Sequence, residues 1–489
     1  MIFENSKSTI QTPTMLFNSL SFLWFFPIVF IFYWFVFSNN RKMQNGMLLV
    51  ASFYFYATWN YKFLFLLLFS ILLDFFSAIK IEQSANSKKK TFWLTLSIGI
   101  NLGFLAVFKY YNFFAGAMSD LLKEIGLQID MNILEVILPV GISFYTFHGL
   151  SYIIDVYKSR IKAERDFVDY GLFVAYFPLL VAGPIERATH LLPQIKVSRS
   201  FNYENAVSGI KLIIWGFFKK VVVADNCSFF VNQLFNDVSN KSSAELLVGM
   251  LLFSFQIYGD FSGYSDIAIG VSKLLGIDLL INFKFPYFSR NCADFWKRWH
   301  ISLSSWFRDY LYIPLGGSKC SKYKHLRNVF IVFLVSGFWH GANWTFIIWG
   351  LFHALFFIPV LLWSKEEATF NSSPLKGFDY WRVLITFIMV SLLWVIFRAK
   401  NLTEAYVYLH RMFSFNGSGL SFFESNNKFE LLFGISILSI IIMMGIEFIS
   451  FQKKAVSVNF SKYTAMGIVL LILLMGTFRN QMSFIYFQF

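Results

Sequence analysis

Long apolar runs recur along the whole chain and are separated by short polar segments, a pattern typical of a protein that crosses a membrane many times. A helix needs about 20 residues to cross roughly 30 Å of hydrocarbon. We therefore predict an all-α polytopic integral membrane protein with about eleven transmembrane helices. The predicted spans are residues 16–37, 46–58, 63–79, 92–108, 133–156, 246–275, 329–343, 344–363, 383–397, 431–449 and 465–478.

Two segments, residues 166–240 and 277–326, break this pattern with proline, glycine and charge. Irregular backbone at membrane depth persists only where protein or a water-filled cavity satisfies its polar groups. We therefore predict that both segments form re-entrant or interfacial pieces that line a site. The chain shows no internal repeat of the kind found in inverted-repeat transporters, so residues 1–489 are expected to form a single integral-membrane domain.

Composition and charge agree with a protein that is embedded in a lipid bilayer. Hydrophobic residues make up 56% of the chain and charged residues only 14%, against about 25% charged in soluble domains. The net charge of +14 comes from Lys and Arg in short segments between apolar runs, which argues against a nucleic-acid-binding surface. Basic clusters at residues 41–42, 80–90 and 158–165 follow the first, third and fifth spans, so the N-terminus is predicted outside.

The most informative polar residue is His340, inside the apolar run 329–343. Thirteen helical residues separate it from Arg327, the end of a basic cluster, which places the imidazole about 20 Å deeper and past the bilayer midplane. An ionisable side chain at this depth faces a cavity or the bundle interior. His340 is therefore a candidate general base, while a neutral histidine hydrogen-bonded between helices fits the same position.

Charged and indole side chains interleave in residues 294–310. The simpler interpretation is an amphipathic interfacial helix, with tryptophan at the headgroups and basic side chains on lipid phosphates. His300 is the residue of this segment for which we expect a function. The supporting candidates that could line a tunnel are Arg298, Trp299, Arg308 and Asp309 here, together with Trp339 and Asn343 beside His340.

Asp260 and Asp266 interrupt the apolar run 246–275, where unpaired carboxylates would be costly. We expect them to pair with Arg or Lys of the 294–310 segment rather than to act in catalysis. Residues 182–187 form a helix-breaking turn with adjacent opposite charges, Glu186 and Arg187. Neither a serine nucleophile elbow nor a phosphate loop is present, and the three cysteines follow no metal or disulfide spacing, so no metal site is predicted.

Several of these motifs occur together in one known family. Residues 294–310, followed by Ile-Pro-Leu-Gly-Gly at 313–317 and Phe-Trp-His-Gly-Ala at 338–342, resemble the membrane-bound O-acyltransferase family, in its bacterial alginate O-acetyltransferase-like branch. The resemblance covers nearly the whole chain. It extends to residues 15–19, 139–145, 182–185 and 397–399.

The resemblance implies a ring of helices around a central tunnel, with the family's invariant histidine at His340 and its more variable polar residue at His300. It also implies transfer of an acetyl group from a cytoplasmic thioester, expected to be acetyl-CoA, towards hydroxyls of a secreted or cell-wall polysaccharide. His340 would deprotonate the acceptor, and Asn343 or His300 would support the oxyanion. No permanently bound cofactor is expected. The expected partners are the bilayer of the bacterial inner membrane and a periplasmic SGNH-type acetyltransferase.

Three alternatives remain open at the level of sequence. A sister branch of the family moves D-alanine towards teichoic acids. A non-enzymatic polysaccharide or lipid transporter would use the polar clusters as a conduit, with His340 as a gate or proton relay. An inactive scaffold for the periplasmic transferase is the third. Consumption of acetyl-CoA that depends on His340 distinguishes the enzyme, and the catalytic interpretation requires His340 to be reachable from both aqueous sides.

Overall fold

The computed structural model describes residues 15–127, 137–363, 373–415, 417, 419, 427–478, 484 and 485. These residues form helices and contain no β-strand. The first group is α1 (Leu20–Ile31) continuing into η1 (Phe32–Val36), α2 (Arg41–Ala57), α3 (Tyr61–Gln83), α4 (Ser87–Leu105), η2 (Ala106–Tyr110), α5 (Tyr111–Glu124) and α6 (Ile142–Tyr157). Asparagine side chains cap α2, α3 and α4, each accepting a hydrogen bond from the first turn, which fixes where these helices begin.

The middle of the chain combines short and long helices. The short helices are α7 (Phe167–Ala175), α8 (Phe177–Leu180), α9 (Ala188–Lys196), η4 (Val238–Asn240), η5 (Pro286–Phe288), α13 (Cys292–Trp296), α14 (Ile301–Phe307) and η6 (Arg308–Tyr312). The longer ones are α10 (Tyr203–Phe217), η3 (Phe218–Ala224), α11 (Asp225–Asn236) and α12 (Ser243–Leu274). The last group is α15 (Lys322–His340), α16 (Trp344–Trp363), α17 (Asp379–Arg398), α18 (Leu402–Phe413), α19 (Asn427–Gln452) and α20 (Lys462–Met475).

Each of the eleven predicted spans overlaps a helix. In the 133–156 span, residues 133–136 lie outside the described part of the chain and the helix begins only at Ile142. The all-α prediction is therefore confirmed for the described residues. Six helical stretches are long and apolar enough to cross a bilayer by themselves: Tyr61–Gln83, Ser87–Glu124, Ser243–Leu274, Trp344–Leu361, Asp379–Arg398 and Phe429–Gln452. The number of spans remains a prediction.

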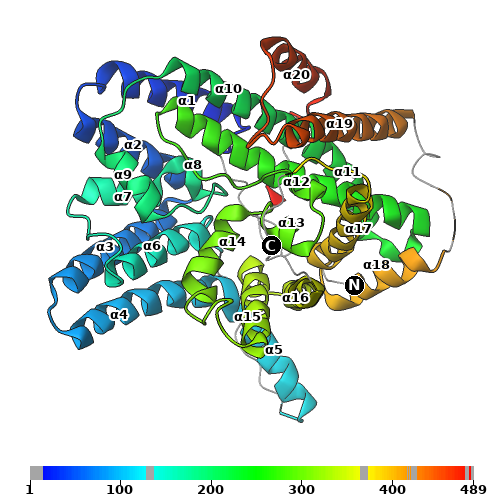
Figure 1. Ribbon diagram of the computed structural model, residues 1–489, viewed down its shortest axis with the longest axis horizontal. Helices are drawn as coiled ribbons and strands as arrows, with labels where there is room; N and C mark the ends of the chain where they lie inside the picture. Colours follow the sequence, from blue (N-terminus) through cyan, green and yellow to red (C-terminus); the bar gives the residue numbers. More distant parts are fainter. Residues whose placement is uncertain are drawn as a thin grey trace, which may run out of the picture.

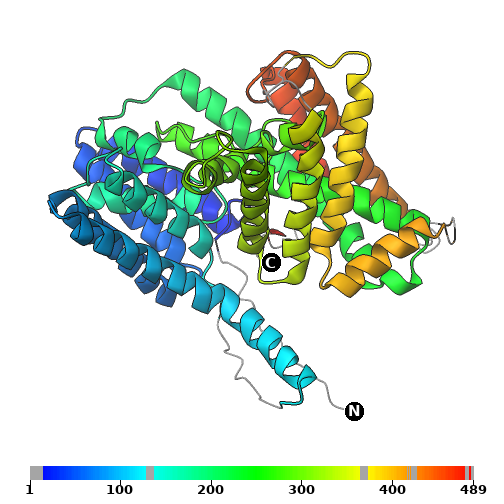
Figure 2. The same cartoon turned by 60° about the horizontal axis from the view of Figure 1, so that its bottom comes forward.

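Several boundaries differ from the sequence prediction. The span predicted at 92–108 continues through η2 and α5 to Glu124, because the charge of Lys109 does not end the helix. Figure 2 shows the far end of this long helix extending away from the other helices. The segment 166–240, predicted to be irregular, ends in a nearly continuous helical run, α10–η3–α11, that packs along α12.

Helix α12 runs between two hydrophobic cores. The first core gathers buried side chains of α1–α4, α6–α9 and α14 with the C-terminal half of α12. The second gathers those of α11, α13 and α16–α19 with its N-terminal half. The short helices α13 and α14 lie in the middle of the molecule with the longer helices around them (Figure 1). The interrupted segment 277–326 is thus central, as expected for a segment that lines a site.

Glycine allows α15 and α16 to pack against each other closely. A Cβ atom added to Gly337 would lie 2.3 Å from the carbonyl oxygen of Phe346, and one added to Gly350 would lie 2.4 Å from that of Phe333. Small residues permit such backbone contact between membrane helices. This packing holds the C-terminal end of α15, and with it His340, against α16.

Candidate active site

His340 is the last residue of α15 and lies where the two hydrophobic cores meet. Its imidazole packs edge-on against Trp339, with ring centroids 5.0 Å apart, and against Trp349 and Phe397 at 5.2 and 5.4 Å. Trp339 belongs to the first core, whereas Trp349 and Phe397 belong to the second. The side chain of His340 is 5% exposed. The buried position predicted from the apolar run is therefore confirmed.

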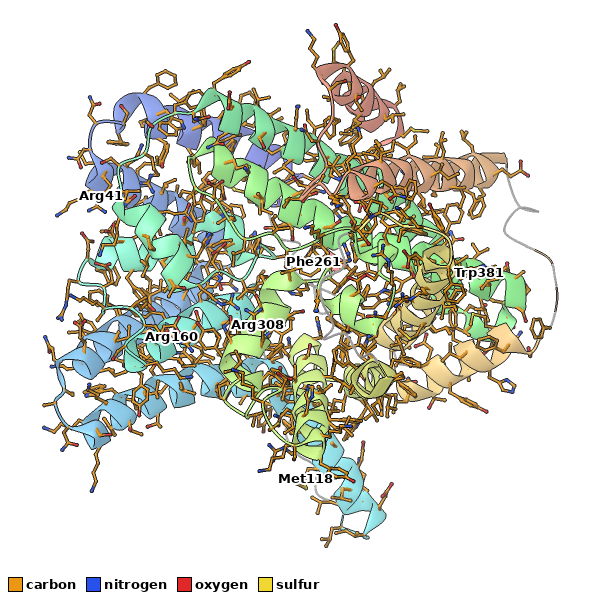
Figure 3. The ribbon with its side chains drawn as sticks, in the orientation of Figure 1. Arg41, Met118, Arg160, Phe261, Arg308 and Trp381 are labelled. Atoms are coloured by element: carbon orange, nitrogen blue, oxygen red, sulfur yellow. The ribbon has the colours of Figure 1, made fainter. Side chains whose placement is uncertain are left out.

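His300 approaches the same place from the turn between α13 and α14. Its backbone is left-handed, with φ +44°, which is uncommon for a residue with a side chain and marks local strain. The fully buried imidazole lies 4.7 Å from the ring of Phe261 and 6.1 Å from that of Trp339. Figure 3 shows Phe261 near the middle of the molecule. One indole, that of Trp339, therefore contacts both candidate histidines.

Lys109, one residue beyond the predicted span 92–108, belongs to this site. Its ammonium group donates a hydrogen bond to the carbonyl oxygen of Trp339, 2.6 Å away, and lies 5.5 Å from the Trp339 ring. The neighbouring Tyr110 hydroxyl donates to the carbonyl oxygen of Phe338 at 3.0 Å. These carbonyls end α15 and lack intrahelical partners, so η2 stabilises the turn that carries His340. The feature of the sequence that could have selected Lys109 is its position as a single lysine in a long apolar run.

His353 on α16 is a third buried histidine near the site, and sequence analysis did not select it. The Trp296 indole N–H donates to its Nδ1 at 3.2 Å. The His353 ring lies 4.7 Å from Trp349, which itself contacts His340. His353 is thus joined to His340 through one shared indole.

The segment 294–310 is not the interfacial helix that its sequence predicted. It forms two short helices, α13 and α14, separated by the turn at His300. Arg298 is buried and forms an ion pair with Asp294 at 2.8 Å, and Trp299 packs 4.9 Å from Trp394 in the second core. The pattern misled because one of the three cations of the segment, Arg298, is neutralised by this ion pair and can therefore be buried.

Asp260 and Asp266 are paired, as expected, but with different partners. Lys220 lies 2.7 Å from Asp260 and Lys219 lies 2.6 Å from Asp266. Both lysines come from η3, whereas the prediction placed the partners in the 294–310 segment. A second carboxylate, Asp225, also binds Lys220 at 2.7 Å.

The turn at residues 182–187 sends its two charges to different partners instead of pairing them with each other. The Arg187 guanidinium lies 3.2 Å from Asp309, which also accepts from Arg308 at 2.8 Å. Glu186 binds His190 at 2.8 Å, and this hydrogen bond raises the pKa of His190. Arg308 and Asp309 therefore connect η6 to this turn, and within the described residues no ion pair or hydrogen bond joins their side chains to His300 or His340.

Comparison with known proteins identifies the family. A family model described as "MBOAT, membrane-bound O-acyltransferase family" matches residues 159–403, a range that includes both histidines. The chain is 38% identical to the peptidoglycan O-acetyltransferase of Helicobacter pylori, over 84% of this chain and 82% of the relative. It is 37% identical to the probable alginate O-acetylase AlgI of Pseudomonas aeruginosa, over 88% and 81%. The chain belongs to the membrane-bound O-acyltransferase family.

A more distant relative is the teichoic acid D-alanyltransferase of Bacillus subtilis, 31% identical over 53% of this chain and 69% of the relative. The membership confirms the resemblance drawn from the motifs. The protein is an acyltransferase and a multi-pass membrane protein.

In this acyltransferase Asn343 links two helices. Its Oδ1 accepts a hydrogen bond from the Thr345 N–H at 3.1 Å, and its Nδ2 donates to the Lys400 carbonyl oxygen at 2.8 Å. The side chain therefore caps the start of α16 and connects it to the end of α17. Among the sequence candidates, Trp339, His300 and His340 are brought together, whereas Asn343 is engaged at the edge of the site.

The surface that the described residues form includes two hollows away from the histidines. One, of about 740 Å³, lies between α1 and α2. The other, of about 330 Å³, lies beside the loop from α9 to α10. Neither is lined by His300 or His340. Within the described part of the chain, no group of three or more His, Cys, Asp or Glu residues could hold a metal ion.

Proposed function

We propose that this acyltransferase moves an acetyl group from a cytoplasmic thioester, acetyl-CoA, across the bacterial inner membrane towards hydroxyls of a secreted or cell-wall polysaccharide. The observation that carries the choice of acetyl is the similarity to O-acetyltransferases along more than four fifths of the chain. The D-alanyltransferase of Bacillus subtilis aligns with about half of it.

In the proposed reaction His340 is the general base. It takes the proton of the acceptor hydroxyl as the oxygen attacks the thioester carbonyl carbon. The carbon–sulfur bond then breaks, and the leaving thiolate takes this proton from His340, which becomes neutral again. A positioned base contributes about 10²- to 10⁴-fold to the rate. The packing of His340 among Trp339, Trp349 and Phe397 supports this role, since an apolar surrounding excludes water and limits thioester hydrolysis.

Substrates must reach a side chain that is 5% exposed in this conformation. We infer that side chains around His340 move when donor and acceptor bind. The proposed orientation has the N-terminus outside, so that the basic clusters face the cytoplasm with the donor. A periplasmic SGNH-type acetyltransferase is the proposed partner that passes the group to the polymer.

The test uses the full chain in lipid nanodiscs with radiolabelled acetyl-CoA. The wild type should release the free thiol of coenzyme A and transfer the labelled acetyl group. His340→Ala should abolish the release and the transfer while the protein remains folded. His410→Ala, an exposed histidine on α18, is the matched control and should retain wild-type rates. Consumption of acetyl-CoA that is unaffected by His340→Ala would remove His340 from the mechanism. No consumption at all would favour the transporter or the scaffold, and consumption of a D-alanyl thioester instead would favour D-alanyl transfer.

The acceptor and the partner are tested in cells. Loss of the protein should lower the acetyl content of a secreted or cell-wall polymer, and expression of His340→Ala should not restore it. An unchanged acetyl content in every polymer would contradict the proposed acceptor class. A reporter at the N-terminus that is labelled only from the cytoplasm would overturn the orientation.

A further inference from the structure

Two backbone hydrogen bonds hold the segment after α12 beside the turn at His300. The Ile301 N–H donates to the carbonyl oxygen of Asn282, and the Lys284 N–H donates to that of Arg298, each at 2.9 Å. Asn282 is therefore fixed next to the imidazole of His300. Its Oδ1 lies 3.0 Å from His300 Nδ1, and both side chains are fully buried.

The orientation of the Asn282 amide follows from its other partners. Ser302 Oγ accepts a hydrogen bond from the Ile185 N–H at 2.9 Å and donates its hydroxyl hydrogen to Asn282 Oδ1, also at 2.9 Å. The Asn282 Nδ2 donates to Ser265 Oγ at 3.1 Å. The amide oxygen, an acceptor, is thus the atom that faces His300.

This arrangement selects one tautomer of His300. Because Asn282 Oδ1 only accepts, His300 Nδ1 must carry the hydrogen, and a neutral imidazole has no second one. The remaining nitrogen, Nε2, then carries a lone pair. In the part of the chain that the structure describes, this buried atom has no hydrogen-bond partner. A buried polar atom left unsatisfied is costly and calls for an explanation.

We propose that Asn282 and Ser302 are positioning residues that hold His300 with Nδ1 protonated, so that Nε2 accepts a hydrogen bond from a second hydroxyl of the acceptor molecule, beside the hydroxyl that His340 deprotonates. This inference rests on the proposed acetyl transfer. In this role Nε2 of His300 is a hydrogen-bond acceptor that orients the substrate carrying the nucleophile. A neutral His300 in this tautomer cannot donate a hydrogen bond to an oxyanion through Nε2. It also gives the turn at residues 182–187 a role, since the Ile185 N–H sets the direction of the Ser302 hydroxyl.

The experiment compares Asn282→Ala, Ser302→Ala and Asn282→Asp in nanodiscs. The matched controls are Asn226→Ala and Ser254→Ala, which remove buried amide and hydroxyl groups that bond elsewhere, to Val222 and to Ser391. Nuclear magnetic resonance of isotope-labelled histidine reads the tautomer directly, and His300→Gln assigns the signal. Acetyl-CoA consumption is measured on the same samples.

We expect Asn282→Ala to lose the Nδ1-protonated signal of His300 and about tenfold or more of the rate, the scale found when the group that orients a histidine is removed. Asn282→Asp keeps an acceptor at this position and should restore both readouts. Ser302→Ala should show a smaller loss of the same kind, and the two controls should show neither.

A His300 signal protonated at Nε2 in the wild type would overturn the inference. So would an unchanged tautomer and rate in Asn282→Ala. Should Asn282→Ala fail to fold, the other two variants still test the proposal. Loss of the Nδ1-protonated signal in Asn282→Asp, or an unchanged tautomer and rate in Ser302→Ala, would contradict it. If the wild type consumes no acetyl-CoA, the proposed function fails while the tautomer measurement still stands.

Discussion

The ammonium group of Lys109 donates a hydrogen bond to the main-chain oxygen of Trp339, the residue before His340. A hydrogen bond from a charged group contributes about 1.5–3 kcal/mol. Lys109→Met should therefore lower the melting temperature in detergent and reduce acetyl-CoA consumption about tenfold, because the end of α15 loses an anchor. Lys123→Met, an exposed lysine on α5, is the control. A rate equal to that of Lys123→Met would show that the bond does not position His340.

His300→Ala is expected to cause a large loss of activity with a residual rate, since His340 remains in place. The loss should appear in the turnover number with little change in folding. Steady-state rates and far-ultraviolet circular dichroism measure the two effects separately. Wild-type turnover in this variant would assign His300 to structure alone.

The hydrogen bonds of Asn343 predict a structural role for this residue rather than a chemical one. Both its amide groups are engaged, in a cap on α16 and a bond to Lys400. Asn343→Ala should therefore cost about 1 kcal/mol of stability and change the rate only a few-fold. A loss of about 10²-fold or more with an unchanged melting temperature would instead indicate an oxyanion donor.

Lys220 holds two buried carboxylates, Asp225 and Asp260. Lys220→Met leaves both without this cation and should reduce the free energy of unfolding by about 3–5 kcal/mol. Adding Asp260→Asn to this variant should recover part of the loss. Thermal melting of the single and double variants tests the coupling, with the exposed Lys62→Met as the control. Additive effects in the double variant would show that the pair is not coupled.

The ion pair of Glu186 with His190 predicts a pH dependence of stability. The hydrogen bond to Glu186 raises the pKa of His190 above its usual value of 6.5 in the folded state. Its contribution is therefore fully present below about pH 6.5 and is lost as the pH rises through the raised pKa. The melting temperature should fall over that range in the wild type, and His190→Gln should flatten the profile. An identical profile in the variant would contradict this origin.

The spans could be predicted because each apolar run is a local property of the sequence. Lys109 was misassigned because a charge was taken to end a span, whereas the end of α15 supplies a carbonyl partner from far along the chain. The burial of Arg298 depends on Asp294 being turned towards it, which the interleaved pattern did not reveal.

The sequence pattern could not predict the contacts of His300 for a similar reason. Its contact with Asn282 joins two non-helical segments, one before α13 and one after it. No periodicity marks such a pairing. The motifs nevertheless selected both histidines as candidates, because the order of the motifs along the chain is characteristic of the family.

The left-handed backbone at His300 also decides which replacement is the cleanest chemical probe. Glycine adopts this conformation without steric cost, whereas alanine retains the strain and a β-branched residue would add to it. His300→Gly removes the ring and keeps the chain path. We expect the void beside Asn282 to admit free imidazole, so small heterocycles added to the medium become a means of restoring the lost group from outside.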